Sequence, residues 1–388
     1  NAADWLLLGA NFRNYSIYTE GTIFNEDPDN TGTFSRISIN EYGAYAQVRK
    51  KLLEDIMFTG SVRYDKNENF DGRVTPRLSL VYSFAKNSHI RISYQTGFRN
   101  PDTQAQYIFF PSSSGTILGT ARDNAERYGV MEGGAWSAAS YQSYVLSGGV
   151  LDSISGVPSG GTPSVLITES VSYVKPERLS AYEIGYKGLI GDNFMADVNY
   201  YSTNYRDFLS SKVVAIKQST THRGQQINAG QLFSLHSNAE DLVKSWGVGV
   251  GLTWNLPEGF VLAGNYSYAD LKVDYATEGS NFLSYFNTPK NMYGFTFSNR
   301  EMLKNLGFSA SFRTASAFTY ESSFSIWEIP AYSALDAQVS YKIESMKTIL
   351  KLGGNNIGIG SGDYRTRPGG PYVGKLWYVT LTFDEFLN

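Results

Sequence analysis

The chain contains no cysteine among its 388 residues. It therefore cannot form a disulfide framework or a thiolate metal site. It has only three histidines, His89, His222 and His236, and their spacing does not fit a zinc site. We expect these histidines to line a lumen or lie on a surface, and we predict no metal ion and no cofactor.

The chain also lacks long apolar runs and a large excess of either charge. No stretch of about 18 consecutive apolar residues occurs, which excludes a transmembrane helix. Charged residues make up only 18% of the chain, and the formal net charge of −3 indicates no polyanionic partner such as nucleic acid. The mean hydropathy of −0.27 is also typical of membrane barrels, because every second residue of their strands faces water.

Catalytic patterns are missing as well. The glycine-rich stretch Gly353–Gly360 lies between two expected strands with no helix after it, which argues against a dinucleotide site. No serine lies in a nucleophile-elbow pattern. The stretch Asp27–Gly32 (DPDNTG) resembles a calcium loop only loosely, since no acid stands at the twelfth position. We interpret it as a polar turn, with a calcium site on an outer loop as the alternative, and we predict that the protein is not an enzyme.

Apolar and polar residues alternate along much of the sequence, as they do in β-strands, and the pattern is clear at the C-terminal end. In residues 373–388 (VGKLWYVTLTFDEFLN), apolar side chains take one parity, and Tyr378, Thr380 and Thr382 take the other. This pattern predicts a strand with one lipid-facing side. A strand of this kind, finishing on an aromatic residue, is typical of the end of an outer-membrane barrel. We predict that barrel-assembly machinery reads its apolar positions, Trp377, Val379, Leu381, Phe383 and Phe386.

The same alternation recurs in about fourteen segments, each of about 9–11 residues or more, the span of a tilted membrane strand. Short and long connections alternate between them, as in barrels with short periplasmic turns and long outer loops. Charges in these segments keep to one parity, since a lipid-facing charge costs about 2–4 kcal/mol at the midplane. These charges are Arg13, Glu41, Arg63, Arg91, Glu183, Lys187, Asp197, Arg313, Asp336, Lys347 and Lys351. We predict an all-β fold, a transmembrane antiparallel β-barrel.

Regular alternation is lost from Arg99 to Val174, and a second long excursion, roughly residues 206–244, is only partly strand-like. We assign residues 99–176 as a long extracellular loop within a single barrel domain that covers residues 1–388. Exposed aromatic side chains over a barrel mouth suit ligand stacking or the docking of a partner, whereas the alternative is packing within the loop. The candidate ligand contacts are Tyr107, Phe109, Tyr128, Trp136 and Tyr141.

Four segments carry a family resemblance. The segment Tyr173–Gly188 (YVKPERLSAYEIGYKG) resembles a strand entry of TonB-dependent outer-membrane receptors, and Ile92–Tyr107 (ISYQTGFRNPDTQAQY) resembles the strand end before one of their long outer loops. The segment Asn287–Phe295 (NTPKNMYGF) is similar to their "NTP" strand entry, and Gly353–Phe383 is similar to their final segment. The four occur in family order, and their style resembles receptors of the Bacteroidetes near the SusC-like group.

The resemblance implies a plugged barrel of about 22 strands. Because the chain starts at Asn1 with neither Met nor a signal sequence, we expect it to be the C-terminal part of a longer polypeptide, preceded by the plug, the TonB box and the first strands. We expect the whole protein to lie in the outer membrane of a Gram-negative bacterium.

The implied function is import of a large scarce nutrient such as a siderophore, oligosaccharide or peptide. The implied partners are the TonB energy-transducing system, acting through the plug, outer-membrane lipids, and a surface lipoprotein over the outer loops. A stand-alone passive porin-like barrel and a structural scaffold in a larger outer-membrane complex are the alternatives.

Overall fold

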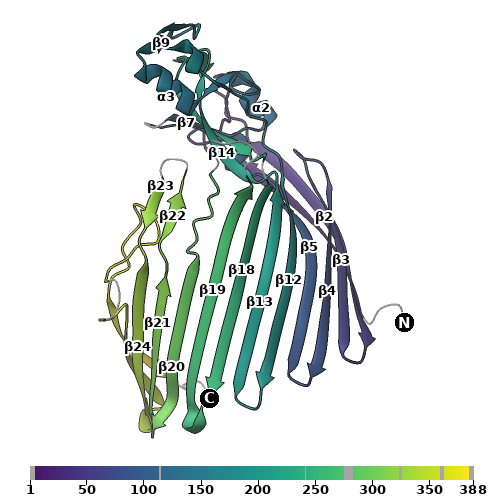
Figure 1. The fold of residues 1–388 in the computed structure, drawn as a ribbon, viewed down its shortest axis with the longest axis vertical. Coiled ribbons are helices and arrows are strands. Elements are labelled where there is room, and N and C mark those ends of the chain that lie inside the picture. Colours follow the sequence, from purple (N-terminus) through teal and green to yellow (C-terminus); the bar gives the residue numbers. More distant parts are fainter. Residues whose placement is uncertain are drawn as a thin grey trace.

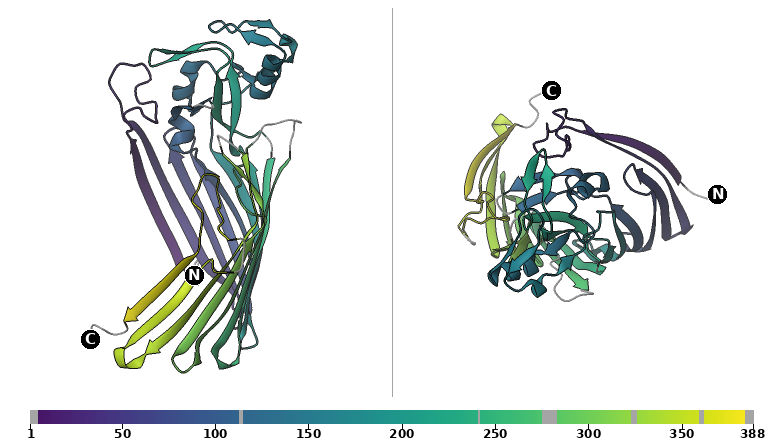
Figure 2. Two further views of the ribbon diagram at one scale, coloured as in Figure 1. Left: turned by 90° about the vertical axis from the view of Figure 1, so that its left-hand side faces the viewer. Right: turned by 90° about the horizontal axis from the view of Figure 1, so that it is seen from above.

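A computed structural model describes residues 5–112, 115–240, 242–274, 283–322, 326–358 and 362–383. Within them, fourteen strands form one curved antiparallel sheet (Figures 1 and 2). In order along the sheet, the strands are β1 (Trp5–Ile17), β2 (Ile37–Leu53), β3 (Ile56–Asn67), β4 (Arg73–Ala85), β5 (Ser88–Arg99), β12 (Glu177–Ile190), β13 (Phe194–Arg206), β18 (Leu242–Asn255), β19 (Phe260–Asp274), β20 (Asn291–Leu303), β21 (Leu306–Ala315), β24 (Tyr332–Ile343), β25 (Thr348–Asn355) and β26 (Leu376–Phe383).

Neighbouring strands of the sheet follow one another in sequence, with short turns at one end and long connections at the other. The short turns use left-handed backbone positions such as Gly191 (φ 63°), Asn305 (φ 65°) and Lys347 (φ 46°). Such positions are typical of tight hairpins. The predicted antiparallel all-β sheet is confirmed. In the part of the chain that the structure describes, β1 and β26 are the edges of this sheet.

The two faces of the sheet differ as the alternation predicted. The outward face exposes large apolar side chains along the middle of the strands, among them Phe12, Leu80, Ile92, Tyr182, Leu252 and Phe295. The inward face carries ion pairs between neighbouring strands, of Arg91 with Glu183 and of Lys187 with Asp197. The prediction was wrong for Lys347, which lies in the turn before β25 and not on the inward face of a strand.

Two of the long connections fold together at one end of the sheet (Figure 1). We call this unit, formed by residues 100–112, 115–176 and 207–240, the cap. Its elements are α1 (Thr103–Tyr107), β6 (Phe109–Ser112), β7 (Gly115–Leu118), α2 (Arg122–Ala125), η1 (Glu126–Tyr128), β8 (Ala135–Ser137), α3 (Ala138–Leu146), β9 (Gly149–Leu151), β10 (Pro158–Gly160), η2 (Pro163–Val165), β11 (Thr168–Glu169), β14 (Leu209–Ile216), β15 (Thr220–His222), β16 (Gln225–Ile227) and β17 (Leu232–Asn238).

The cap is held by a six-stranded sheet of order β11-β8-β14-β17-β7-β6 that alternates between the two connections. Because β14 pairs with β8 and β17 pairs in parallel with β7, neither connection forms this sheet alone. Both contribute to one buried core, whose members include Leu118, Val130, Val171, Val214, Ile216, Phe233 and Leu235. The first connection, whose sequence lacks regular strand alternation, is therefore folded. It folds jointly with the second connection, between β13 and β18.

The terminal strand β26 pairs with β25 and ends at Phe383 in the described residues. Trp377, Val379, Leu381 and Phe383 are all exposed and share one parity, as predicted. Phe386 lies outside the described residues. The remaining elements are the hairpin of β22 (Phe318–Glu321) and β23 (Ile326–Ile329) and the turns η3 (Pro257–Gly259) and η4 (Glu344–Met346). No helix of the described residues is long and apolar enough to cross a membrane.

Candidate ligand-binding site

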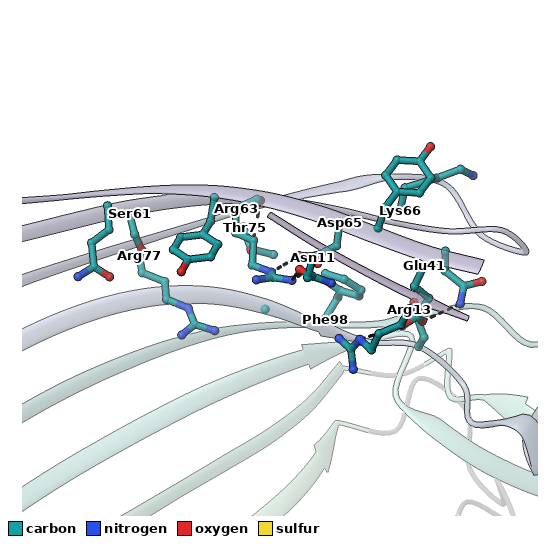
Figure 3. Close-up of a pocket in the computed structure, with 16 residues that line it drawn as sticks. Asn11, Arg13, Glu41, Ser61, Arg63, Asp65, Lys66, Thr75, Arg77 and Phe98 are labelled. Atoms are coloured by element: carbon teal, nitrogen blue, oxygen red, sulfur yellow. Dashed lines mark hydrogen bonds and ion pairs between the residues drawn. The ribbon is translucent and has the colours of Figure 1, made fainter. Parts of the chain in front are cut away.

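The inward face of β1 to β5 forms a polar cavity of about 600 Å³ close to the cap (Figure 3). Its lining is rich in charged and amide side chains because the inward parity of these strands is polar. The members used below are Asn11, Arg13, Glu41, Arg63, Asp65 and Arg77.

Arg63 on β3 is the fixed centre of this cavity wall. Its Nε lies 2.6 Å from Oδ2 of Asp65, and its Nη2 donates to Asp65 Oδ1 at 2.5 Å and to Asn11 Oδ1 at 2.7 Å. A two-point contact between guanidinium and carboxylate fixes the orientation of both groups. Arg63 and Asp65 therefore form a neutral, rigid part of the wall.

Glu41 on β2 collects donors from three other segments. Its Oε1 accepts hydrogen bonds from Asn67 Nδ2 at 2.7 Å and from Asn100 Nδ2 at 3.2 Å, and its Oε2 accepts from the Tyr15 hydroxyl at 3.2 Å. Arg13 lies 4.0 Å from the same carboxylate. Glu41 thus joins β1, β3 and the strand end after β5 at the cavity rim.

Two arginines leave positive charge available in the cavity. The side chain of Arg13 is 60% exposed although it lies near Glu41. Arg77 on β4 is exposed and has no ion-pair partner among the described residues. Arg63 is paired with Asp65, and Lys66, which also lines the cavity, donates from Nζ to the carbonyl oxygen of Phe70 at 2.5 Å. The exposed guanidinium groups of Arg13 and Arg77 are therefore suited to contact an anionic or oxygen-rich ligand.

The cavity wall is connected to the cap through Asn69, in the connection between β3 and β4. Its Nδ2 donates to Gln106 Oε1 at 2.7 Å and to the Tyr107 hydroxyl at 2.9 Å. Burial, with a smaller contribution from the negative charge of Asp123, raises the pKa of Tyr107 to about 12. Tyr107 is therefore a neutral phenol that joins the cap to the strands below it.

The predicted aromatic contacts lie in or beside the core of the cap. Tyr107, Phe109 and Tyr128 are only 8%, 5% and 3% exposed. Trp136 and Tyr141 are half-buried, and Lys217 Nζ lies 4.2 Å from the centre of the Trp136 ring. The burial of Tyr107, Phe109 and Tyr128 fits the alternative of packing within the loop. A ligand contact by any of the five side chains stays a prediction.

Sequence reasoning missed the contacts of His222, which packs against two of those aromatic side chains. Its ring stacks on Phe109 with a centroid separation of 3.5 Å, and its Nδ1 lies 2.8 Å from the Tyr128 hydroxyl. No local signal could have shown this, because the partners come from the other connection. The inward charges of the cavity, by contrast, were visible from strand parity, although their clustering was not.

The calcium alternative finds no support in the described residues. Asp27 Oδ1 accepts from the backbone N–H and the hydroxyl of Thr31 at 2.8 and 3.0 Å, and its Oδ2 accepts from Gly32 N–H at 2.9 Å. These bonds lower the pKa of Asp27, although burial opposes them. They form a polar turn of the type predicted. Within the described ranges, no group of three His, Asp or Glu side chains could hold a metal ion.

Comparison with protein families decides what kind of sheet this is. The model of the family "TonB dependent receptor-like, beta-barrel" matches residues 1–357. The chain belongs to the TonB-dependent receptor β-barrel family. Members of this family are receptors and transporters rather than enzymes, and they are integral proteins of the Gram-negative outer membrane. The outward face of the sheet is accordingly its lipid-facing side.

Solved structures share the fold at low sequence identity. The FrpB iron transporter of Neisseria meningitidis aligns with a TM-score of 0.62 at 15% identity, over 99% of this chain and 53% of that one. The siderophore receptor PirA of Acinetobacter baumannii aligns with a TM-score of 0.60 at 12% identity, over 91% and 47%. A mutant of the ferric enterobactin receptor PfeA of Pseudomonas aeruginosa aligns with a TM-score of 0.57 at 13% identity, over 91% and 45%. No curated protein matches in sequence, and the chain spans about half the length of these structures.

Proposed function

We propose that the chain is the C-terminal part of the barrel of a TonB-dependent importer, with a plug and the first strands of a barrel of about 22 strands supplied by preceding sequence. The observation that carries the proposal is the polar inward cavity directly below a folded cap. A nutrient captured at the cap end would meet this cavity on its way through the barrel. The half-length alignment with receptor structures supports the same assignment.

The orientation follows from the connection lengths. Short turns face the periplasm and long connections face outward in barrels of this kind. We therefore propose that residues 99–176 form an extracellular loop, that the TonB system acts from the other side through the plug, and that a surface lipoprotein contacts the outer loops. The four motif resemblances support a receptor of the Bacteroidetes type, near the SusC-like group.

A ferric siderophore is the substrate class we favour over oligosaccharides and peptides. The aligned structures are named as an iron transporter, a siderophore receptor and a ferric enterobactin receptor. Ferric siderophores present a compact, oxygen-rich and often anionic surface, which suits the available guanidinium groups of Arg13 and Arg77. Import requires that the ligand both binds to the cavity wall and leaves it again. Because Arg63 of the wall is paired with Asp65, the ligand makes few charged contacts with the wall.

The test is growth and uptake in the native bacterium. Deletion of the gene should abolish growth on a ferric siderophore as sole iron source, and loss of TonB should have the same effect. The double variant Arg13→Gln/Arg77→Gln should weaken uptake about tenfold or more, because two charge-assisted contacts are removed. Arg49→Gln, which changes an inward arginine of β2 away from the cavity, should leave uptake unchanged.

The alternatives predict different outcomes. A passive porin-like barrel would give uptake that is independent of TonB. A scaffold would show unchanged uptake on deletion, with loss of neighbouring membrane proteins instead. Unchanged uptake in the double variant together with TonB-dependent import would reject the cavity as the ligand path but keep the importer assignment.

A further inference from the structure

The sheet is not closed along the whole length of β4 and β5. Their ladder runs from the short turn between them as far as Arg77 and Gln95 and ends there. Toward the cap, residues 73–76 of β4 continue to pair with β3, and residues 96–99 of β5 continue to pair with β12. In this described part of the two strands, no backbone pairing joins residues 73–76 to residues 96–99. We call this unpaired stretch the seam.

Pro76 explains why the ladder ends at this point. The hydroxyl of Thr96 donates to the Pro76 carbonyl oxygen at 3.2 Å, so this carbonyl faces β5. The N–H and the C=O of one residue in an antiparallel strand face the same neighbouring strand. Because proline has no N–H, it cannot donate to β5 at this position. A side-chain hydrogen bond therefore takes the place of the backbone bonds that join the two strands elsewhere.

The seam lies between two hollows of the sheet. On the inward side is the polar cavity of about 600 Å³ described above, and a groove of about 860 Å³ lies along the seam itself. Thr75, Gly97 and Phe98 line both the cavity and the groove. The groove is also lined by Pro76 and Thr96, which have the outward parity of their strands. The cavity and the outward side of the sheet are therefore separated at the seam by few residues.

A glycine and a movable side chain stand between the two hollows. Gly97 contributes no side chain, and a Cβ added there would come no closer than 3.4 Å to its nearest neighbour, Leu179. Phe98 has the outward parity of Tyr94 on β5, yet it also lines the inward cavity, where Figure 3 draws it. Its side chain is half-buried. A change of its rotamer would join the cavity to the groove without any change in the strands.

Aromatic and apolar side chains mark the level of the seam in the membrane. On the outward face, the rings of Tyr94 and Tyr182 lie 4.9 Å apart, directly before the seam. Tyr and Trp gather at the headgroup level of a bilayer. Toward the middle of the strands, Leu80 and Ile92 lie opposite each other and are exposed on the same face. The seam therefore meets the bilayer at headgroup level, next to an apolar surface that continues into the membrane.

We propose that the seam is a lateral opening for an amphiphilic ligand, whose anionic, oxygen-rich head lies in the cavity while its acyl chain stays in the outer leaflet. The guanidinium groups of Arg13 and Arg77 contact the head, and Arg77 is the last residue of the β4 ladder before the seam. Each methylene that leaves lipid for water changes the equilibrium constant about fourfold. A lateral opening avoids this cost for the whole chain. The inference names a substrate class for the proposed importer and rests on that proposed function.

The test maps the position of the acyl chain in the whole receptor, purified from outer membranes and placed in lipid nanodiscs. The probe is the ferric complex of citrate that carries one dodecyl chain, with a photoreactive diazirine near the polar end of the chain. After illumination, we expect the label on peptides that contain residues 73–76 and 96–99. Excess ferric citrate without the chain, and the double variant Arg13→Gln/Arg77→Gln, should each reduce this labelling about tenfold or more, because the head holds the chain at the seam.

A reversible bridge across the seam gives a matched comparison. The chain has no cysteine, so the pair Thr75→Cys/Gly97→Cys can be bridged selectively within it by a short, reducible thiol reagent. These positions would face each other if the ladder continued past Arg77 and Gln95. The bridge should abolish labelling of the seam, and reduction should restore it, which also shows that the variant is folded. The control pair Ser79→Cys/Ser93→Cys lies where β4 and β5 are already paired, so its bridge should leave labelling unchanged.

Three outcomes overturn the lateral opening. Labelling of the seam that neither ferric citrate nor the arginine double variant reduces would assign the groove to the chains of membrane lipids. Labelling that persists in the bridged Thr75→Cys/Gly97→Cys variant would show that the chain does not pass between the strands. TonB-dependent growth on a ferric siderophore without any labelling of the seam would reject the opening but keep the importer assignment. Labelling of the seam without TonB-dependent growth would reject the importer assignment alone.

Discussion

The hydroxyl of Tyr128 lies 2.8 Å from Nδ1 of His222, a residue 94 positions later in the sequence, and this contact joins the two connections that form the cap. The amide of Asn25, from the connection between β1 and β2, donates to the same hydroxyl at 2.9 Å. Burial and the neighbouring arginines lower the pKa of His222 to about 4, while burial raises the pKa of Tyr128 to about 12. Both groups are therefore neutral near pH 7, and three connections meet at one uncharged contact.

The stability of the cap should fall as the pH falls from about 6.5 to 4. Over this window the unfolded cap protonates His222, with its ordinary pKa of 6.5, whereas the folded cap does not. The folded state therefore loses stability until the pH reaches the folded pKa, and no further loss from this group follows below it. Hydrogen exchange of the amides of β14 and β17, followed against pH, measures the effect.

The control for this prediction is the variant His222→Gln, which removes the titrating group. It should show a smaller loss of protection between pH 6.5 and 5 than the wild type, while His89→Gln, on β5 outside the cap, should behave like the wild type. An identical pH dependence in wild type and His222→Gln would contradict the assignment.

Deletion of residues 99–176 alone should misfold the remaining part of the cap. The buried side chains Val214, Ile216, Phe233 and Leu235 would lose their partners, and burial of each is worth about 1.5–3 kcal/mol. Replacement of both connections by short turns should instead leave a sheet that inserts into membranes but does not bind ligand. Membrane insertion is read from heat-modifiable mobility on gels, and aggregation of the double replacement would contradict the view of the cap as a separate folding unit.

Strand parity let the sequence predict the sheet but not the cap. Residues on a strand such as β12 show their environment at every second position, so Glu183 and Lys187 could be placed inward from the sequence alone. Phe109 and Tyr128 gave no such signal, because their burial depends on β14 and β17, which follow about 100 residues later. The sequence left ligand contact and packing within the loop as alternatives for these two residues, and in the structure both lie in the buried core of a jointly folded unit.

The same limit applies to charged side chains of the sheet. Arg13, Glu41 and Arg63 were assigned to the inward face, but the register between β1, β2 and β3 was needed to show that they share one cavity. Arg206 lies at a strand end, where alternation alone does not decide whether a charge faces lipid or a loop. Its position opposite Arg178 comes only from the pairing of β12 with β13.

Gly156→Ala should open the outer tip of the cap, formed by β9 and β10. Gly156 has a left-handed backbone (φ +69°), and an added Cβ would collide with the carbonyl oxygen of Lys217 at the end of β14. This tip is joined to the second connection by the Ser219 N–H, which donates to Ile154 O at 3.0 Å. The left-handed backbone alone costs about 1 kcal/mol for alanine, and the backbone collision adds to this cost.

Gly148→Ala is the matched control, because Gly148 also has a left-handed backbone (φ +86°) but open space around the added Cβ. Limited proteolysis between β9 and β10 should be clearly faster in Gly156→Ala than in Gly148→Ala. Equal rates for the two variants would mean that the contact with Lys217 does not hold the tip.

The terminal strand offers the sharpest test of the two faces, through arginine at neighbouring positions of β26. Val379 is 68% exposed on the apolar face, so Val379→Arg should cost about 2–4 kcal/mol of folding free energy if it lies near the midplane. Thr380 has the inward parity, opposite Lys351 on β25, where an arginine faces water and meets at most a like-charge repulsion of about 1 kcal/mol. The folded fraction in vesicles, measured by heat-modifiable gel mobility across a urea series, should therefore fall far more for Val379→Arg than for Thr380→Arg. Equal effects would place both side chains in the same environment and would contradict the assignment of lipid-facing and inward sides on which the cavity depends.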